Sequence, residues 1–145
     1  MDPELHPDVS ALSALLGTWE GTGTGEYPTI DDFAYHESIT FTHVGKPFLV
    51  YTQRTRHPET GLPMHTESGY WRVPGSGSIE IVMAQPTGLA EIYEGAVVAN
   101  DGTVVIDVHS TSVGATTSAK EVTITERTFS VTGDDMQYTF RMAAV

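Results

Sequence analysis

Hydrophobic and polar residues alternate along most of the chain from Phe33 onward, and turn residues recur about every ten positions. Side chains two positions apart in a strand share a face, so this alternation is typical of β-strands with one buried side. Short strands separated by regular turn signals favour an antiparallel meander over alternating strands and helices. We expect strands near 33–43, 48–56, 64–73, 79–84, 89–98, 103–110, 119–129 and 136–144.

A glycine-rich segment, Gly17–Gly25, precedes these strands and contains a tryptophan, Trp19. We expect the first strand here, because glycine tolerates a sharp bend and lets a neighbouring group approach closely. Before it, Pro7–Leu16 predicts a short helix that lies on the barrel end beside Trp19. Closing the strands on themselves removes exposed edges. The sequence therefore predicts an all-β fold: an antiparallel up-and-down β-barrel of about ten strands with a short N-terminal helix, in one domain covering residues 1–145.

Two of the predicted strands carry apolar residues mixed with polar ones on a single face. On one strand this face holds Met136, Tyr138, Phe140 and Met142, and on the other Ile79, Ile81, Met83 and Gln85. A barrel of about eight or more strands has room for a small ligand, and a lining of methionine and aromatic residues suits a flat apolar one. A completely filled core is the alternative.

The composition removes several classes of function. The formal net charge of -12 and the pI near 4.6 disfavour nucleic acid or an anionic membrane as partner. The absence of cysteine from the sequence excludes a disulfide scaffold, a zinc ribbon and a cysteine nucleophile, and fits a reducing interior. The first residues lack a basic stretch followed by an apolar one, and the sequence contains no apolar run long enough to span a membrane. We expect a cytoplasmic protein.

Motifs for catalysis are scarce. The six histidines occur singly and not at metal-ligand spacing, and neither a Gly-x-Ser-x-Gly elbow nor a phosphate-binding Gly-Lys-Ser/Thr motif is present. His65 differs from the others because it stands beside Met64 in a strand that continues into Tyr70 and Trp71. It is either a histidine facing a ligand cavity or an ordinary core or rim residue.

A set of short motifs, in a fixed order from Leu12 to Met142, resembles the nitrobindin family. These motifs are Gly17-x-Trp19-x-Gly21-x-Gly23, Tyr27-Pro28-Thr29-Ile30, Gly45-Lys46-Pro47-Phe48, Tyr51-Thr52-Gln53, Met64-His65-x-Glu67-Ser68-Gly69-Tyr70 and Ala119-Lys120-Glu121. The resemblance implies a barrel similar to fatty-acid-binding proteins that holds a ferric b-type heme in its mouth. It further implies a heme-dependent peroxynitrite isomerase, which converts peroxynitrite to nitrate and could also bind nitric oxide.

The resemblance also implies which residues surround the heme. Carried over by motif, they are Thr29, Phe33, Met64, His65, Gln85, Lys120 and Met142, with Thr29 and Lys120 at the heme edge or propionates. A lysine suits a propionate in an otherwise acidic protein. Family members continue past the last strand into a segment that carries the axial histidine. We therefore expect the iron ligand beyond Val145, with His65 as the best substitute within these residues, although a distal role suits it better.

A carrier of a fatty acid or another small apolar ligand is the competing class of protein. Such a carrier needs a cation deep inside the barrel for the carboxylate of its ligand. The candidates in predicted strands are Arg54, Arg72, Lys120, Arg127 and Arg141. Alternation alone does not say which of them point inward. The sequence also leaves open the oligomeric state.

Overall fold

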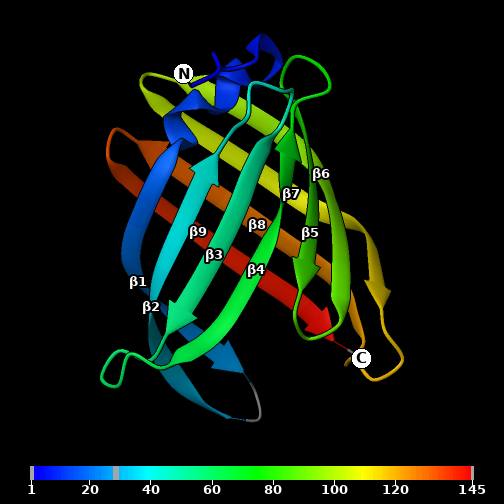
Figure 1. Ribbon diagram of the computed structural model, residues 1–145. Helices are drawn as coiled ribbons and strands as arrows, with labels where there is room; N and C mark the ends of the chain where they lie inside the picture. Colours follow the sequence, from blue (N-terminus) through cyan, green and yellow to red (C-terminus); the bar gives the residue numbers. More distant parts are fainter. Residues whose placement is uncertain (1, 28–29, 145) are drawn as a thin grey trace.

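The computed structural model describes residues 2–27 and 30–144. The described part begins with a 3-10 helix, η1, and continues as nine strands. The elements are η1 (Pro7–Leu15), β1 (Gly17–Tyr27), β2 (Ile30–Thr42), β3 (Leu49–Arg56), β4 (Pro63–Arg72), β5 (Ser78–Gln85), β6 (Leu89–Asn100), β7 (Thr103–Ala115), β8 (Val122–Thr132) and β9 (Asp135–Ala144). Each strand pairs antiparallel with the next in one sheet, which curls into a nearly closed barrel (Figure 1).

The predicted fold class is confirmed, with three differences in detail. The described residues contain nine strands instead of about ten, because no long segment splits at a bend. Strand β7 continues to Ala115, because its pairing with β6 resumes after a bulge between Ile92 and Tyr93. Strand β8 begins at Val122 and not at 119, because residues 116–121 turn away from the ladder. The Thr116 amide donates to the Gly88 carbonyl there, which ties this connection to the β5–β6 turn.

The helix η1 covers one end of the barrel, as predicted. Val9, Leu12 and Leu15 on its inner side are fully buried. Trp19 lies just after the helix and donates from Nε1 to the Leu15 carbonyl at 2.8 Å. We call this the closed end of the barrel. A short helix gains its stability from such packing and not from its own propensity.

Two glycines of β1 make room for aromatic rings of β2. Gly23 and Gly25 pair with Tyr35 and Phe33, and a Cβ built at either glycine would lie within 2.5 Å and 2.2 Å of the partner's ring. At Gly21 a Cβ would meet nothing within 4 Å. The glycine-rich motif is thus partly a packing feature, in which missing side chains are replaced by rings from the neighbouring strand.

The interior changes character along the barrel axis. Next to η1 it is apolar and aromatic: Trp71 is fully buried and stacks edge-on against Phe41 and Phe129, at centroid distances of 4.9 and 5.0 Å. Further from the helix, buried polar and charged side chains replace this packing.

None of the helices in the described part of the chain is long and apolar enough to cross a membrane.

Candidate functional site

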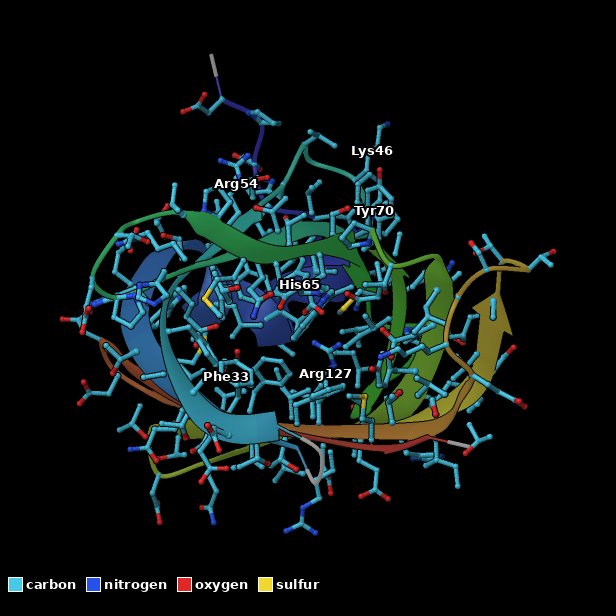
Figure 2. All side chains as sticks on the ribbon, turned by 90° about the horizontal axis from the view of Figure 1, so that it is seen from below. Phe33, Lys46, Arg54, His65, Tyr70 and Arg127 are labelled. Carbon is cyan, nitrogen blue, oxygen red and sulfur yellow. The ribbon has the colours of Figure 1, made fainter. Side chains whose placement is uncertain are left out.

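The end of the barrel opposite η1 is the barrel mouth. The β3–β4, β5–β6 and β7–β8 connections gather there, β1 ends and β2 begins there, and β9 runs toward it (Figure 1). Figure 2 looks into the barrel from this end and shows Phe33, His65 and Arg127 pointing into the interior. Arg54 and Tyr70 project outside the ring of strands in the same view. Phe33 and His65, two of the predicted site residues, therefore share the interior at the mouth with Arg127.

Apolar side chains on this inner face are left uncovered. Phe140 and Met142 of β9 pair with Arg127 and Thr125 of β8, which are buried inside the barrel. Directly paired residues share a face, so Phe140 and Met142 also face inward. Each is nevertheless 40% exposed. An inward-facing apolar surface that stays open to solvent is typical of a binding site.

A cluster of buried polar side chains lies inside the barrel, between the mouth and the apolar packing next to η1. We call it the polar floor, and its members come from β3, β4, β5, β6 and β8. They are Tyr51, Glu67, Gln85, Glu91, Tyr93 and Arg127. Because buried polar groups are costly unless they are hydrogen-bonded, a cluster with this many mutual contacts is well defined in space.

Arg127 is the centre of the polar floor. Its NH1 and NH2 groups both donate to the Glu67 carboxylate, and its Nε donates to the Tyr93 hydroxyl at 3.0 Å. NH2 also lies 3.6 Å from Glu91 Oε1. The ring of Phe140 lies 4.5 Å from the guanidinium carbon. The guanidinium thus connects two carboxylates and the apolar surface at the mouth.

The hydrogen bonds and ion pairs of the polar floor stabilise the ionised forms of Glu67 and Arg127. Burial alone would raise the pKa of the Glu67 carboxyl, but Arg127, with hydrogen bonds from Gln85 and Tyr51, holds that pKa below its usual range. Burial would likewise lower the pKa of Arg127, and the neighbouring Glu67 raises it well above its ordinary value. Burial raises the pKa of the Tyr51 and Tyr93 hydroxyls, which therefore stay protonated as donors.

Gln85 links the polar floor to the mouth. Its Nε2 donates to Glu67 and to Glu91, each at 2.7 Å. Its Oε1 lies 2.7 Å from Nε2 of His65, which is half-buried nearer the mouth on β4. Among the described residues His65 is the histidine whose side chain joins this network on the inner face.

A second, smaller group of buried polar residues lies beside the polar floor. Gln53 Nε2 donates to Glu37 at 3.0 Å, and the Tyr138 hydroxyl donates to the same carboxylate. Burial raises the pKa of Tyr138, so its hydroxyl also remains a donor. Glu37 has two donors in this group, which satisfies a carboxylate that is only 8% exposed.

The structure brings together several of the predicted site residues. Phe33, His65, Gln85 and Met142 lie on the inner face near the mouth, as the alternation predicted for Gln85 and Met142. Their contact with a heme stays a prediction. Thr29 lies outside the described residues.

Met64 and Lys120 are placed less favourably. Met64 precedes His65 at an irregularity in the β3–β4 pairing and is 43% exposed. Lys120 is exposed in the β7–β8 connection, not in a strand as predicted. That connection is hydrogen-bonded to the β5–β6 turn at the mouth, so Lys120 remains a candidate for a charged group there.

Sequence reasoning did not single out the polar floor. Glu91 stands at an inward position between Leu89 and Tyr93, and this is the signal that could have indicated it, whereas the inward neighbours of Glu67 are His65 and Gly69. Arg127 was one of several candidate cations, and the structure shows that it is the buried one, at 4% exposure. Its contact with Glu67 joins residues that are 60 positions apart.

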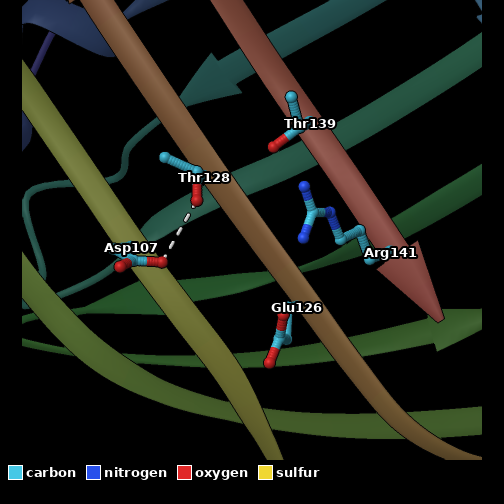
Figure 3. A pocket seen from close by; sticks show the side chains of 5 residues that line it. All are labelled: Asp107, Glu126, Thr128, Thr139 and Arg141. Carbon is cyan, nitrogen blue, oxygen red and sulfur yellow. Dashed lines mark hydrogen bonds between the residues drawn. The ribbon is translucent and has the colours of Figure 1, made fainter. Parts of the chain in front are cut away.

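A separate depression lies on the outside of the barrel, over β7, β8 and β9 (Figure 3). It is lined by Asp107, Glu126, Thr128, Thr139 and Arg141, and Thr128 donates to Asp107 at 3.1 Å. These residues alternate with the inward-facing ones and so face solvent on the opposite side of the sheet from the polar floor. Nothing in this depression points to the chemistry of the mouth.

The donor set at the mouth does not suit a bare metal ion. The described residues contain no group of three or more histidine, cysteine or acidic side chains that could hold one. Inward-facing Phe140 and Met142 with open surfaces, together with aromatic Phe33 on the inner face, instead fit a flat apolar group held by packing. Heme is such a group, and the residues present fit it.

An antiparallel barrel with one end covered by a helix, a buried polar floor and an open apolar mouth defines a small-ligand-binding β-barrel. The model of the THAP4-like, heme-binding beta-barrel domain family matches residues 8–145. The chain belongs to this family, which includes the nitrobindins predicted from its motifs.

Individual relatives agree with this assignment. The chain is 50% identical over 145 residues to peroxynitrite isomerase 2 of Mycobacterium marinum, covering all of this chain and 90% of that protein. It is 51% identical over 141 residues to the peroxynitrite isomerase of Nocardia farcinica, covering 97% of this chain and 84% of that protein. The crystal structure of Rv2717c from M. tuberculosis is similar with a TM-score of 0.95 at 43% identity, over 98% of this chain and 90% of that one.

Proposed function

We propose that this chain binds a ferric b-type heme at the barrel mouth and converts peroxynitrite to nitrate there. The observation that carries the proposal is the uncovered apolar surface of Phe140 and Met142 on the inner face, directly above a polar floor that is already hydrogen-bonded. Relatives about 50% identical over the whole chain bear the name peroxynitrite isomerase, which supports this reaction. When bound, the heme would supply the iron at which the reaction takes place.

The residues of the chain would hold and surround this group. Phe33, Phe140 and Met142 would pack on its faces and keep water away from it. Lys120, and Thr29 beyond the described residues, would contact its edge or propionates. The sequence contains no cysteine, so none of its side chains could form a thioether to the heme, which supports a noncovalent b-type heme. Nitric oxide is a second small ligand that we propose for the same site.

The remaining parts of the proposal concern the domain organisation, the partners and the cellular compartment of the protein. We propose that the whole chain works as one barrel domain on small molecules. A formal net charge of -12 supports neither nucleic acid nor an anionic membrane as a partner. A sequence without cysteine suits the cytoplasm.

The carrier alternative is weakened by the state of Arg127. A fatty-acid carrier needs a buried cation that is free to receive a carboxylate, and Arg127 is buried. Its three guanidinium nitrogens already donate to Glu67 and Tyr93. An incoming carboxylate would have to replace Glu67, which would then lose its partner in a buried place.

Hemin titration followed in the Soret region tests the binding site. We expect a stoichiometric change in the Soret band when hemin is added to the heme-free protein. Met142→Glu should weaken binding at least about tenfold, or about 1.4 kcal/mol, because it puts a charge on the apolar face. Thr139→Glu is the matched control, because Thr139 lies on the outer face of the same strand.

Stopped-flow decay of peroxynitrite tests the reaction itself. The heme-loaded native protein should accelerate the decay beyond an equal concentration of free hemin and should yield nitrate. Equal rates for both would refute the enzymatic part of the proposal. Binding of a fluorescent fatty acid in place of hemin would favour the carrier.

A further inference from the structure

The side-chain amide of Gln85 contacts three side chains from two neighbouring strands. Its nitrogen lies 2.7 Å from Glu67 Oε1 and 2.7 Å from Glu91 Oε1. Its oxygen lies 2.7 Å from Nε2 of His65. An amide has two hydrogens on nitrogen and none on oxygen, so these three contacts are not interchangeable.

The two carboxylates decide which way the amide points. Arg127 donates to both oxygens of Glu67 and keeps it ionised, so this carboxylate can only accept hydrogen bonds. Glu91 accepts from the Tyr93 hydroxyl at 2.7 Å. The atom of Gln85 that faces both carboxylates must therefore be the nitrogen, and its two hydrogens are both used. The amide oxygen is left to face His65.

An amide oxygen accepts hydrogen bonds and never donates them. The imidazole nitrogen opposite must therefore carry a hydrogen. We propose that Gln85 is a positioning residue, which fixes the neutral imidazole of His65 in the tautomer with hydrogen on Nε2 and leaves Nδ1 as its acceptor nitrogen. The polar floor thus sets the chemical state of a residue at the mouth.

The functional meaning of this tautomer rests on the proposed heme site. A histidine binds iron through a nitrogen with a free lone pair. Nε2 of His65 has none while it donates to Gln85, and Nδ1 is the nitrogen next to the side-chain branch and the more hindered of the two. His65 is therefore a hydrogen-bond acceptor toward a small ligand and not an iron ligand. It favours ligands that carry a proton, such as water or a protonated oxyacid, over the bare anion.

Nuclear magnetic resonance of the heme-free, isotope-labelled protein tests the tautomer without any heme. Long-range correlations between imidazole nitrogens and ring protons identify the protonated nitrogen, and the His65→Leu spectrum assigns the His65 signals. We expect hydrogen on Nε2, with this proton protected from exchange. A coupling across the hydrogen bond, from Nε2 to the side-chain carbonyl carbon of Gln85, would identify the acceptor. This measurement needs only the wild-type protein.

Two variants separate the specific contact from a general effect of removing an amide. Gln85→Leu should lose the protected Nε2 proton and let His65 exchange between its tautomers. Gln137→Leu removes an exposed amide on β9 and should leave the His65 spectrum unchanged. Hydrogen on Nδ1, absence of the coupling in the wild type, or a protected proton that persists in Gln85→Leu would each overturn the proposal.

Electron paramagnetic resonance of the hemin-loaded native protein tests the consequence for the iron. The ferric signal should show the same axial histidine ligation in wild type and His65→Leu, because His65 does not ligate. Loss of a histidine-ligated signal in His65→Leu would refute the acceptor role. The two proposals can fail separately, because the tautomer is measured without heme, and the absence of a stoichiometric change in the Soret band on hemin titration would refute only the heme site.

Discussion

Arg127→Met is the most informative test of the polar floor. Methionine keeps much of the length and apolar volume of arginine but removes every donor. The substitution leaves Glu67, which is 5% exposed, with Gln85 and Tyr51 as its donors and without a positive charge nearby. Glu91, 2% exposed, loses the same cation.

The expected cost follows from these burials. Breaking a buried ion pair by removing one partner costs about 3–5 kcal/mol, because the remaining charge stays buried without compensation. A domain of this size has a total stability of about 5–15 kcal/mol, so Arg127→Met should remove a large share of it. Replacing both partners, in Glu67→Leu with Arg127→Met, should cost less than Arg127→Met alone, because apolar groups of similar volume can fill the space.

Urea unfolding followed by tryptophan fluorescence measures these differences, since Trp71 lies fully buried beside the aromatic core. Arg141→Met is the matched control, because Arg141 is exposed on the outer face, and it should change the free energy of unfolding by less than about 0.5 kcal/mol. The reasoning fails if Arg127→Met costs less than about 1 kcal/mol, or if the double variant is as unstable as the sum of the two single ones.

Three further predictions follow from other contacts. Because the pKa of Glu67 is lowered on folding, its stabilising effect is present above its unfolded value, about 4.3, and disappears as pH falls through the lower folded value. Urea unfolding of wild type and Glu67→Gln from neutral to acidic pH should show a difference that shrinks along this range; a constant difference contradicts it. Trp19→Ala should lower the free energy of unfolding by about 3 kcal/mol, because the ring packs at the closed end. Thermal or urea unfolding measures this loss, and full retention of stability would show that the ring is dispensable. Gly23→Ala should cost about 1–3 kcal/mol, because its Cβ meets the Tyr35 ring, whereas Gly21→Ala creates no such clash; equal costs for both would exclude the clash as the cause.

The sequence was sufficient for the fold because alternation and turn residues are local signals. The two-residue periodicity of a strand predicted that Gln85 and Met142 lie on inner faces, and the structure places both there. The start of β8 was missed because the turn at residues 116–121 depends on a contact with Gly88, a residue of another connection. Strand boundaries set by tertiary contacts are not visible in local patterns.

The polar floor could not be predicted for a different reason. Glu67 and Arg127 come from β4 and β8, which are not neighbours in the sheet and meet only across the interior. Alternation says that a residue points inward, but the curvature and stagger of the barrel decide which inward residues face each other. The contact between Gln85 and His65 is easier to predict, because β4 and β5 are neighbours along the chain and in the sheet. It still depends on the register of the two strands.

The polar floor also limits how deep a ligand can enter the barrel. An aliphatic chain that reached past the mouth would have to separate contacts such as those of Gln85 with Glu67 and Glu91, and each buried group left without a partner costs about 1–3 kcal/mol. A flat ligand that stops at Phe140 and Met142 leaves these contacts intact. The depth of the polar floor therefore favours a planar group at the mouth over a long chain along the axis, independently of the state of Arg127.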